Sequence, residues 1–357
     1  MRSRAILLCA ILALFLAGCG SASETFPAAA SQVPAPAGSA LPAKESSRSF
    51  FAMDTYMTVR AYGADEALLD EAEAWVGELE ARISVTREES ELYAINRTGE
   101  GRLSAEAAAL LRGALSLCGE TGGALDVTIY PVVRAWGFTT GEYRVPENEE
   151  LQRLLRYVDY RLVRISEDGE VSVPVGMQLD LGSIAKGYTG DMLCGLLRSG
   201  GVKSALLDLG GNIQAVGGKP DGSAWRVGIR DPIGDGLLGV LPVRDRAVIT
   251  SGGYERYFED ADGNLWWHIM DPATGTPVRN GLISVTVVGE SGLACDALST
   301  ALFVMGQDRA AAYWREHSDF EMILVTEDGR LLMTPDLAQQ FVPSENLSYR
   351  VEEIERA

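Results

Sequence analysis

The sequence predicts an α+β protein built on a mainly antiparallel sheet. After residue 200, short apolar segments of strand-like composition follow one another, with few helical patterns between them. The helical patterns are isolated and do not alternate regularly with strands, as they would in a parallel α/β sheet. Residues 260–264, Asp-Ala-Asp-Gly-Asn, carry a turn signal typical of a hairpin between two strands.

Apolar residues at helical spacing predict helices over residues 65–83, 105–118 and 149–157. In the first of these, six apolar residues share one face: Leu68, Ala72, Trp75, Val76, Leu79 and Ile83. A further helix is expected to begin at Gly182-Ser183 and to end at Gly200-Gly201.

Strands are predicted where short runs are rich in apolar and β-branched residues. The expected strands are residues 56–62, 177–181, 204–209, 225–229, 239–242, 247–251, 254–259, 265–269 and 283–288.

Residues 1–18 have the features of a lipoprotein signal peptide. Arg2 and Arg4 precede an apolar run over residues 5–17 that is too short to span a bilayer. Leu-Ala-Gly-Cys at 16–19 resembles a bacterial lipobox, in which the cysteine is diacylated and becomes the mature N-terminus. The alternative is an uncleaved short anchor in which Cys19 is incidental. We therefore expect a protein anchored to the cell membrane by lipid at Cys19, on its periplasmic or extracellular side.

Composition divides the rest of the chain into two parts. Residues 19–48 are rich in Ala, Ser and Pro and have almost no large apolar side chains, so they are expected to form a disordered tether. Residues 49–357 are long enough for one large domain or for two lobes that share a core.

Charge, cysteine content and the lack of one glycine motif argue against several classes of protein. The formal net charge of −19 argues against a nucleic-acid-binding surface, which needs clustered Lys and Arg. Cys118, Cys194 and Cys295 lie in apolar stretches and are interpreted as buried thiols, not as a disulfide framework. No expected strand is followed by Gly-x-Gly-x-x-Gly, which argues against a nicotinamide dehydrogenase.

Asp296 and Thr300 are spaced to lie one turn apart on the same face of a helix. Their neighbours are small or apolar, so a carboxylate there needs a compensating partner, for which Mg²⁺ is one candidate. The alternative is that Asp296 caps the start of its helix and that Thr300 bonds back to its own backbone.

Residues 180–188 read as a strand that enters a helix through Gly182-Ser183, with Lys186 in the first helical turn. Free N–H groups and the positive end of the helix dipole suit a phosphate group. The alternative is an ordinary junction from which Lys186 extends to solvent.

Two further segments could carry function. Glycines in residues 122–128 allow close approach to a flat ligand, on which Trp136 or Phe138 could pack; these aromatic rings could equally fill a core. His268 precedes the turn signal of residues 271–275, where catalytic groups are often displayed, although a lone histidine is more often structural.

Eight segments in this order resemble the ApbE family of FAD:protein FMN transferases. They are residues 53–55 (MDT), 90–96 (SELYAIN), 123–138 (GALDVTIYPVVRAWGF), 179–188 (LDLGSIAKGY), 207–212 (LDLGGN), 249–254 (ITSGGY), 268–275 (HIMDPATG) and 295–300 (CDALST).

The resemblance implies a T-fold-like core whose two lobes form an FAD cleft. It implies an enzyme that uses Mg²⁺ to transfer FMN from FAD to a Thr or Ser hydroxyl of an exported flavoprotein as a phosphoester, with release of AMP. The acceptor would be an FMN-binding domain or a subunit of an NADH-quinone reductase or Rnf-type complex. Alternatives of other classes are an FAD pyrophosphatase that yields free FMN and AMP, and a non-catalytic FAD-binding lipoprotein.

The resemblance also implies roles for particular residues. Mg²⁺ would be held by Asp296, Thr300 and the backbone carbonyl of Ala185, and His268 is our candidate for the general base. The residues expected to contact FAD are Met53, Thr86, Ala124, Leu125, Asp126, Gly182, Lys186, Tyr188, Ile269 and Met270. At Thr86 members often carry a tyrosine that lies along the flavin, so this contact is in doubt, and the family's Gly-Pro in the third segment is Tyr130-Pro131 here.

Overall fold

The computed structural model describes residues 44–317 and 319–356, which belong to one compact unit. The predicted signal peptide, Cys19 and most of the predicted tether lie outside these residues. Among the described residues, no helix combines the length and the apolar character needed to cross a membrane.

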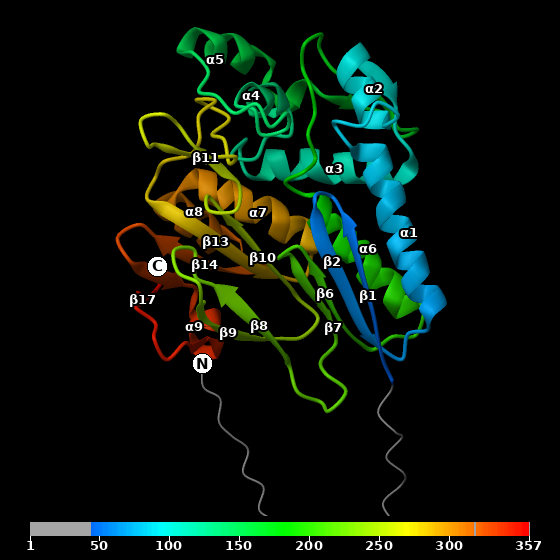
Figure 1. Ribbon diagram of the computed structural model, residues 1–357, viewed down its shortest axis with the longest axis vertical. Helices are drawn as coiled ribbons and strands as arrows, with labels where there is room; N and C mark the ends of the chain where they lie inside the picture. The colour runs from blue at the N-terminus through cyan, green and yellow to red at the C-terminus, as the bar shows by residue number, and fades with distance from the viewer. Residues whose placement is uncertain (1–43, 318, 357) are drawn as a thin grey trace, which may run out of the picture. The chain divides into compact units, whose positions relative to one another are not determined.

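A nine-stranded sheet forms the centre of the unit (Figure 1). Its strands, in spatial order, are β1 (Glu45–Ala52), β2 (Thr55–Tyr62), β6 (Ser204–Leu209), β7 (Ile213–Val216), β10 (Ala247–Gly252), β13 (Leu282–Gly289), β14 (Phe320–Thr326), β15 (Arg330–Met333) and β17 (Arg350–Glu353). All neighbours are antiparallel except β15 and β17. The mainly antiparallel α+β architecture expected from the sequence is confirmed.

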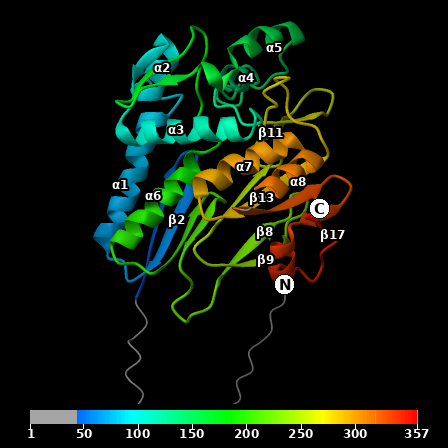
Figure 2. The same ribbon diagram turned by 180° about the vertical axis from the view of Figure 1, so that it is seen from behind.

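Helices cover one face of this sheet (Figure 2). They are α1 (Glu66–Ile83), α6 (Ala185–Ser199), α7 (Gly292–Met305) and α8 (Gln307–Glu316). Alternation along β13 explains the layering, because Val287 packs in the same cluster as Leu302 of α7. Its neighbour Val288 points to the opposite face.

The opposite face is covered by a small sheet of β8 (Trp225–Arg230), β9 (Leu237–Val243) and β16 (Val342–Pro343), together with α9 (Pro335–Gln340). Val288 and Val248 of the large sheet pack there against Val227 and Leu241. The core therefore consists of three layers, with the large sheet in the middle.

A mostly helical region lies at one end of the large sheet (Figure 1). It comprises α2 (Glu91–Thr98), α3 (Ala105–Glu120), α4 (Tyr130–Ala135), α5 (Asn148–Leu154), the 3-10 turns η1 (Leu155–Tyr157) and η2 (Tyr160–Leu162), and a small sheet of β3 (Glu100–Arg102), β5 (Glu170–Ser172) and β4 (Arg164–Ile165). The hairpin of β11 (Tyr257–Glu259) and β12 (Leu265–Trp267) packs beside it, joined by the predicted turn, in which Asp260 N–H donates to the Asn264 carbonyl at 3.0 Å.

The prediction of a strand over residues 177–181 is wrong. Only Gln178 pairs, through a single parallel bridge to Ile129. The Asn96 side chain donates to the Leu179 carbonyl at 2.8 Å and accepts its N–H at 2.7 Å, so a side chain takes the place of a neighbouring strand. The helix that follows begins at Ala185, after a turn over residues 182–184, and not at Gly182-Ser183.

Other boundaries differ by a few residues. β1 begins at Glu45, inside the segment expected to be a tether, because it pairs along its whole length with β2. Its polar outer residues hide this strand from composition, since only Phe50 and Ala52 are buried. β11 begins at Tyr257 and not at residue 254, because the preceding residues form a turn.

The three cysteines of the described chain are Cys118, Cys194 and Cys295. All three are free and buried, which confirms the interpretation as buried thiols.

Candidate active site

Helices α6 and α7 cross at a contact that requires glycine. A Cβ atom on Gly187 would lie 2.2 Å from the Gly292 carbonyl oxygen and 2.6 Å from Cβ of Asp296. Gln214 of β7 closes the crossing by donating from Nε2 to the Gly187 carbonyl at 2.9 Å. This close approach brings Asp296 of α7 against the first turn of α6.

Asp296 is buried at 5% exposure, and its Oδ2 accepts the Gly187 N–H at 2.8 Å. Burial raises the pKa of this carboxyl group, and the positive charge of Lys186 partly offsets that effect. No ion pair to Asp296 is present within the described part of the chain. The suggestion that Asp296 caps its own helix is wrong, because Ser291 is the N-cap of α7.

Thr300 lies one turn further along α7 and turns toward β10. Its Oγ1 is 3.2 Å from Oγ of Ser251. The hydroxyl that bonds back to the helix is that of Ser299, which donates to the Asp296 carbonyl at 2.8 Å. Thr300 is therefore not tied to its own backbone as the alternative proposed.

The three residues implied to hold Mg²⁺ offer a carboxylate, a hydroxyl and a carbonyl, which are oxygen donors of the kind Mg²⁺ prefers. The carbonyl of Ala185 also accepts the Thr189 hydroxyl at 2.7 Å. Over residues 44–317 and 319–356, no three His, Cys, Asp or Glu side chains gather as a metal cluster. The fit to Mg²⁺ accordingly depends on Asp296, a buried carboxylate that accepts one hydrogen bond, from the Gly187 N–H, within the described chain.

The N-terminus of α6 is open to a ligand. Its N-cap residue, Ile184, provides no side-chain hydrogen bond, and the Lys186 N–H has no acceptor among the described residues. The half-buried Lys186 side chain also acts electrostatically on Asp296, Glu255 and His268. A free N–H in the first turn of a helix, beside a lysine, is suited to a phosphate group.

His268 follows β12 and is half-buried. Its Nδ1 lies 3.3 Å from the Arg256 carbonyl, which can only accept, so Nδ1 carries the proton and Nε2 keeps a free lone pair. Burial, with the charge of Arg256, lowers the pKa of His268 to about 4. The imidazole is therefore neutral at physiological pH.

Asp126 organises the turn after Gly122-Gly123. Its Oδ1 accepts the N–H and the hydroxyl of Thr128 at 2.8 and 2.6 Å, and its Oδ2 accepts the Tyr160 N–H at 3.1 Å. Burial raises the pKa of Asp126 and the Thr128 bonds oppose it. Ala124 and Leu125 are buried beside it, and their N–H groups donate to the Thr121 carbonyl at 3.2 Å and to the Thr121 hydroxyl at 3.3 Å.

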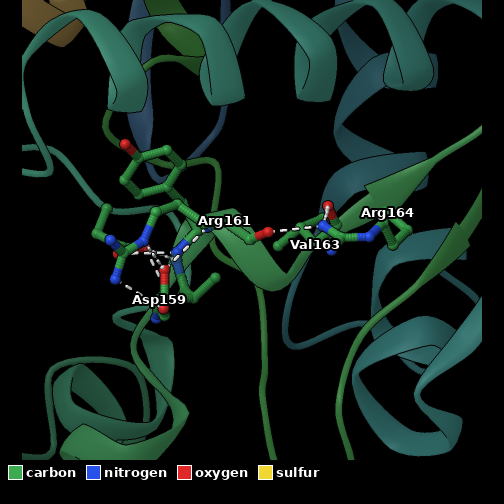
Figure 3. A network of polar contacts seen from close by, with 7 residues as sticks. Asp159, Arg161, Val163 and Arg164 are labelled. Atoms are coloured by element: carbon green, nitrogen blue, oxygen red, sulfur yellow. Dashed lines mark hydrogen bonds and ion pairs between the residues drawn. The ribbon is translucent and has the colours of Figure 1, made fainter.

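The segment that supplies Tyr160 is held by a local polar network (Figure 3). Arg161 pairs with Asp159 through two hydrogen bonds of 2.8 and 3.0 Å, and the Arg161 carbonyl accepts from Arg164 at 2.6 Å. These exposed contacts fix η2 and, through Tyr160, the Asp126 turn.

Trp136 and Phe138 fill a core and do not line a ligand surface. They are 1% and 3% exposed, and Nε1 of Trp136 donates to the Gly275 carbonyl at 2.9 Å. This bond joins the third and seventh segments of the resemblance, far apart in sequence.

Three other residues predicted to contact FAD lie on or beside α6. Met53 and Gly182 lie beside the start of α6, since Met53 Sδ is 3.8 Å from the Thr189 hydroxyl and Gly182 precedes the helix. Tyr188 is on the same helix but faces Trp75 of α1, with ring centroids 6.2 Å apart.

Thr86 is exposed, and its hydroxyl contacts only Ser84 among the described residues, at 3.2 Å. The side chains of Ile269 and Met270 are buried. Their backbone is paired as well, since the Ile269 carbonyl accepts the Val278 N–H at 3.0 Å and Met270 forms a bridge with Pro277.

Sequence reasoning assigned no role to two residues beside this site. Ser251 contacts Thr300, and Asn212 is 2% exposed with an amide Nδ2 that has no partner in the described chain. Each lies in a segment of the resemblance, ITSGGY or LDLGGN, and a polar residue next to glycines at a strand end is the signal that could have indicated them.

A cavity of about 340 Å³ lies at the other end of the α6–α7 crossing. Its lining contains none of the predicted site residues: Asp191, Cys194, Arg198, Gln214, Ala215, Asp245, Arg246, Glu290 and Ser291. It is therefore distinct from the site around Asp296, although Gln214 forms part of its wall.

Comparison with known proteins identifies the family of this chain. The model of the ApbE family matches residues 53–324. An FAD:protein FMN transferase of Treponema pallidum is 35% identical over 313 residues, which cover 81% of this chain and 86% of that protein. An FAD:protein FMN transferase of Klebsiella pneumoniae is 33% identical, and the match covers 82% of this chain and 92% of that protein. The solved structure of a flavin transferase ApbE from Vibrio cholerae superimposes with a TM-score of 0.75 at 31% identity, covering 84% of this chain and all of that one. The chain belongs to the ApbE family.

Proposed function

We propose that this chain is an FAD:protein FMN transferase that needs Mg²⁺. It would transfer FMN from FAD to a Thr or Ser hydroxyl of an exported flavoprotein and release AMP. Relatives that bear this enzyme name cover most of the chain. The observation that carries the proposal is that Asp296, Thr300 and the open start of α6, all inside the family match, meet at one place.

The FAD-binding part of the proposal uses the same surroundings. The diphosphate of FAD would lie at the start of α6, near Gly182 and Lys186, where a free N–H and a positive charge favour an anion. Met53 and the Ala124–Asp126 turn would contact the rest of the molecule.

Asp296, Thr300 and the Ala185 carbonyl would hold Mg²⁺. When bound, the ion supplies charge neutralisation on the diphosphate oxygens. The chain contributes a fixed carboxylate, since Gly187 holds Oδ2 of Asp296. It also contributes the helix dipole and Lys186, which are suited to stabilising negative charge on the phosphates.

His268 would remove the proton from the acceptor hydroxyl. The hydroxyl oxygen forms a bond to the phosphorus of the FMN half while the bond from that phosphorus to the bridging oxygen breaks, and AMP leaves with that oxygen. The proton passes to Nε2 of His268, whose lone pair is free because Nδ1–H is engaged by Arg256.

The proposed site of action is the outer side of the cell membrane. The lipobox at Cys19 supports a diacylated N-terminus followed by a tether. Replacing Cys19 with serine should give an unprocessed or soluble form. Unchanged mass and unchanged membrane association after fractionation would contradict the lipid anchor.

The direct test is mass spectrometry of an FMN-binding domain co-expressed with this chain. The expected result is an acceptor heavier by one FMN phosphoester, with AMP formed in equal amount and only when Mg²⁺ is present. AMP release at the same rate without acceptor would indicate a pyrophosphatase. FAD binding without either product, and equal in EDTA, would indicate a non-catalytic flavin-binding protein.

A further inference from the structure

Asn212 is a buried amide without a partner. It is 2% exposed, and within the described residues no acceptor lies in hydrogen-bonding geometry with its Nδ2. The residue follows the Gly210-Gly211 turn between β6 and β7, where both glycines have positive φ, at 68° and 91°. A buried donor left unpaired destabilises the fold, so the position of this amide needs an explanation.

The approach to β7 places this amide beside Asp296. Asn212 directly precedes β7 and continues its pairing with β6, since the Leu209 N–H donates to the Asn212 carbonyl at 3.0 Å. Side chains two residues apart on extended backbone point to the same face, so Asn212 and Gln214 both face the α6–α7 crossing. Gln214 bonds to the Gly187 carbonyl, and the N–H of the same Gly187 bonds to Asp296. Asn212 lies close enough to Asp296 to lower the pKa of that carboxyl group, although the two do not meet in hydrogen-bonding geometry.

The carboxylate has room for this second donor. Its Oδ2 accepts from Gly187, whereas its Oδ1 has no hydrogen-bond partner among residues 44–317 and 319–356. A metal ligand is typically oriented by a hydrogen bond from a neighbouring group, and loss of such a group weakens metal binding.

We propose that Asn212 is a positioning residue, which donates from Nδ2 to the Asp296 carboxylate when Mg²⁺ and FAD are bound and thereby fixes the oxygen that faces the ion. This inference rests on the proposed function. It assigns to Asn212 no contact with FAD and no part in proton transfer.

The test compares the wild type with Asn212→Ala in thermal melts, first without ligands and then with FAD and increasing Mg²⁺. Because the amide is unpaired in the free protein, the variant should melt at or above the wild-type temperature without ligands. With FAD present, the Mg²⁺ concentration for half-maximal stabilisation should rise roughly 10- to 100-fold. FAD affinity in EDTA should not change.

Ser204→Ala is the matched control. Ser204 is also buried, and its Oγ has no partner in the described chain, but it lies at the other end of β6, roughly 16 Å along the strand from Leu209. Its Mg²⁺ midpoint should equal that of the wild type.

Three results would overturn the inference. The first is an unchanged Mg²⁺ midpoint in Asn212→Ala. The second is weaker FAD binding of the variant in EDTA, which would indicate a direct ligand contact. The third is a lower melting temperature of the variant without ligands, which would indicate a structural role. A wild type that Mg²⁺ does not stabilise would instead refute the metal assignment of the proposed function, and this inference with it.

Discussion

The N-termini of α6 and α7 lie at the same helix crossing but are built differently. At α7, Asp191 of α6 accepts the N–H groups of Gly292 and Leu293 at 2.6 and 2.9 Å, and Ser291 accepts that of Ala294 at 3.2 Å. At α6, the Lys186 N–H has no acceptor in the described chain, and the only carboxylate in hydrogen-bond contact is Asp296, which takes the N–H of Gly187.

The difference separates a structural carboxylate from one suited to a ligand. Both aspartates are buried or half-buried, and burial raises the pKa of both. Asp191 uses both oxygens to accept N–H groups of a neighbouring helix, whereas Oδ1 of Asp296 has no hydrogen-bond donor among the described residues. Burial and a shifted pKa do not distinguish the two residues, but the count of hydrogen-bond donors does.

The largest expected effect is that of Asp296→Ala. Loss of the only carboxylate in the proposed Mg²⁺ site should reduce Mg²⁺-dependent FMN transfer on the order of a thousandfold, because metal stabilisation of phosphoryl transfer contributes several kcal/mol. Flavin should still bind, since most of its proposed contacts lie elsewhere. The measurement is the initial rate of AMP release with acceptor, over a range of Mg²⁺ concentrations.

Wild-type activity at wild-type Mg²⁺ concentrations would exclude Asp296 as a ligand. The control for charge removal near the crossing is Asp191→Asn, which keeps an acceptor oxygen at the start of α7. Its transfer rate should match that of the parent.

A smaller loss is expected for His268→Asn. A positioned base contributes roughly a hundredfold or more to attack by a weakly acidic hydroxyl, so transfer should slow by that factor. FAD affinity and the Mg²⁺ requirement should change little. If the histidine merely stabilises its turn, the variant will melt early yet transfer FMN at the parent rate, and the assignment as base is then wrong.

The pH dependence of kcat/KM tests the same residue in the free enzyme. Burial lowers the pKa of His268 from its usual 6.5 to about 4, so the neutral form that accepts a proton persists well below pH 6.5. The acid limb of the profile should therefore lie near pH 4. The stability of the fold depends on pH in the same direction. Between pH 6.5 and about 4, His268 binds a proton in the unfolded chain but not in the folded chain. The contribution of His268 to stability is therefore present above pH 6.5 and is lost as the pH falls toward 4.

The sequence predicted the elements whose side chains follow a clear period. Helix α1 and strand β6 were expected at nearly their observed bounds, because one face of each is apolar. Strand β1 was missed because it is a polar edge, and residues 177–181 were misassigned because Asn96 satisfies their backbone from a distant helix. Apolar content alone does not reveal where backbone hydrogen bonds go.

The site could be predicted only in part for a similar reason. Spacing placed Asp296 and Thr300 on one face of a helix, but it could not show that Gly187 permits contact with α6. Asn212 is separated from Asp296 by more than eighty residues, and the packing of β7 against the helix crossing brings the two close. Recognising a site of this kind requires the tertiary structure, because its residues are close in space and far apart in sequence.

The smallest effect on catalysis is expected for Asp191→Ala. This change leaves two N–H groups of α7 and the Ser291 hydroxyl, which donates to Asp191 at 3.1 Å, without their acceptor. Loss of such a cap typically costs about 0.5–2 kcal/mol, so the free energy of unfolding in urea should fall by about 2 kcal/mol. The transfer rate per folded molecule and the Mg²⁺ midpoint should stay at the parent values, because Asp191 serves the start of α7 and not that of α6. A fall in rate greater than the unfolded fraction explains would mean that the two helix starts are coupled, and the division between a structural and a ligand-binding carboxylate would fail.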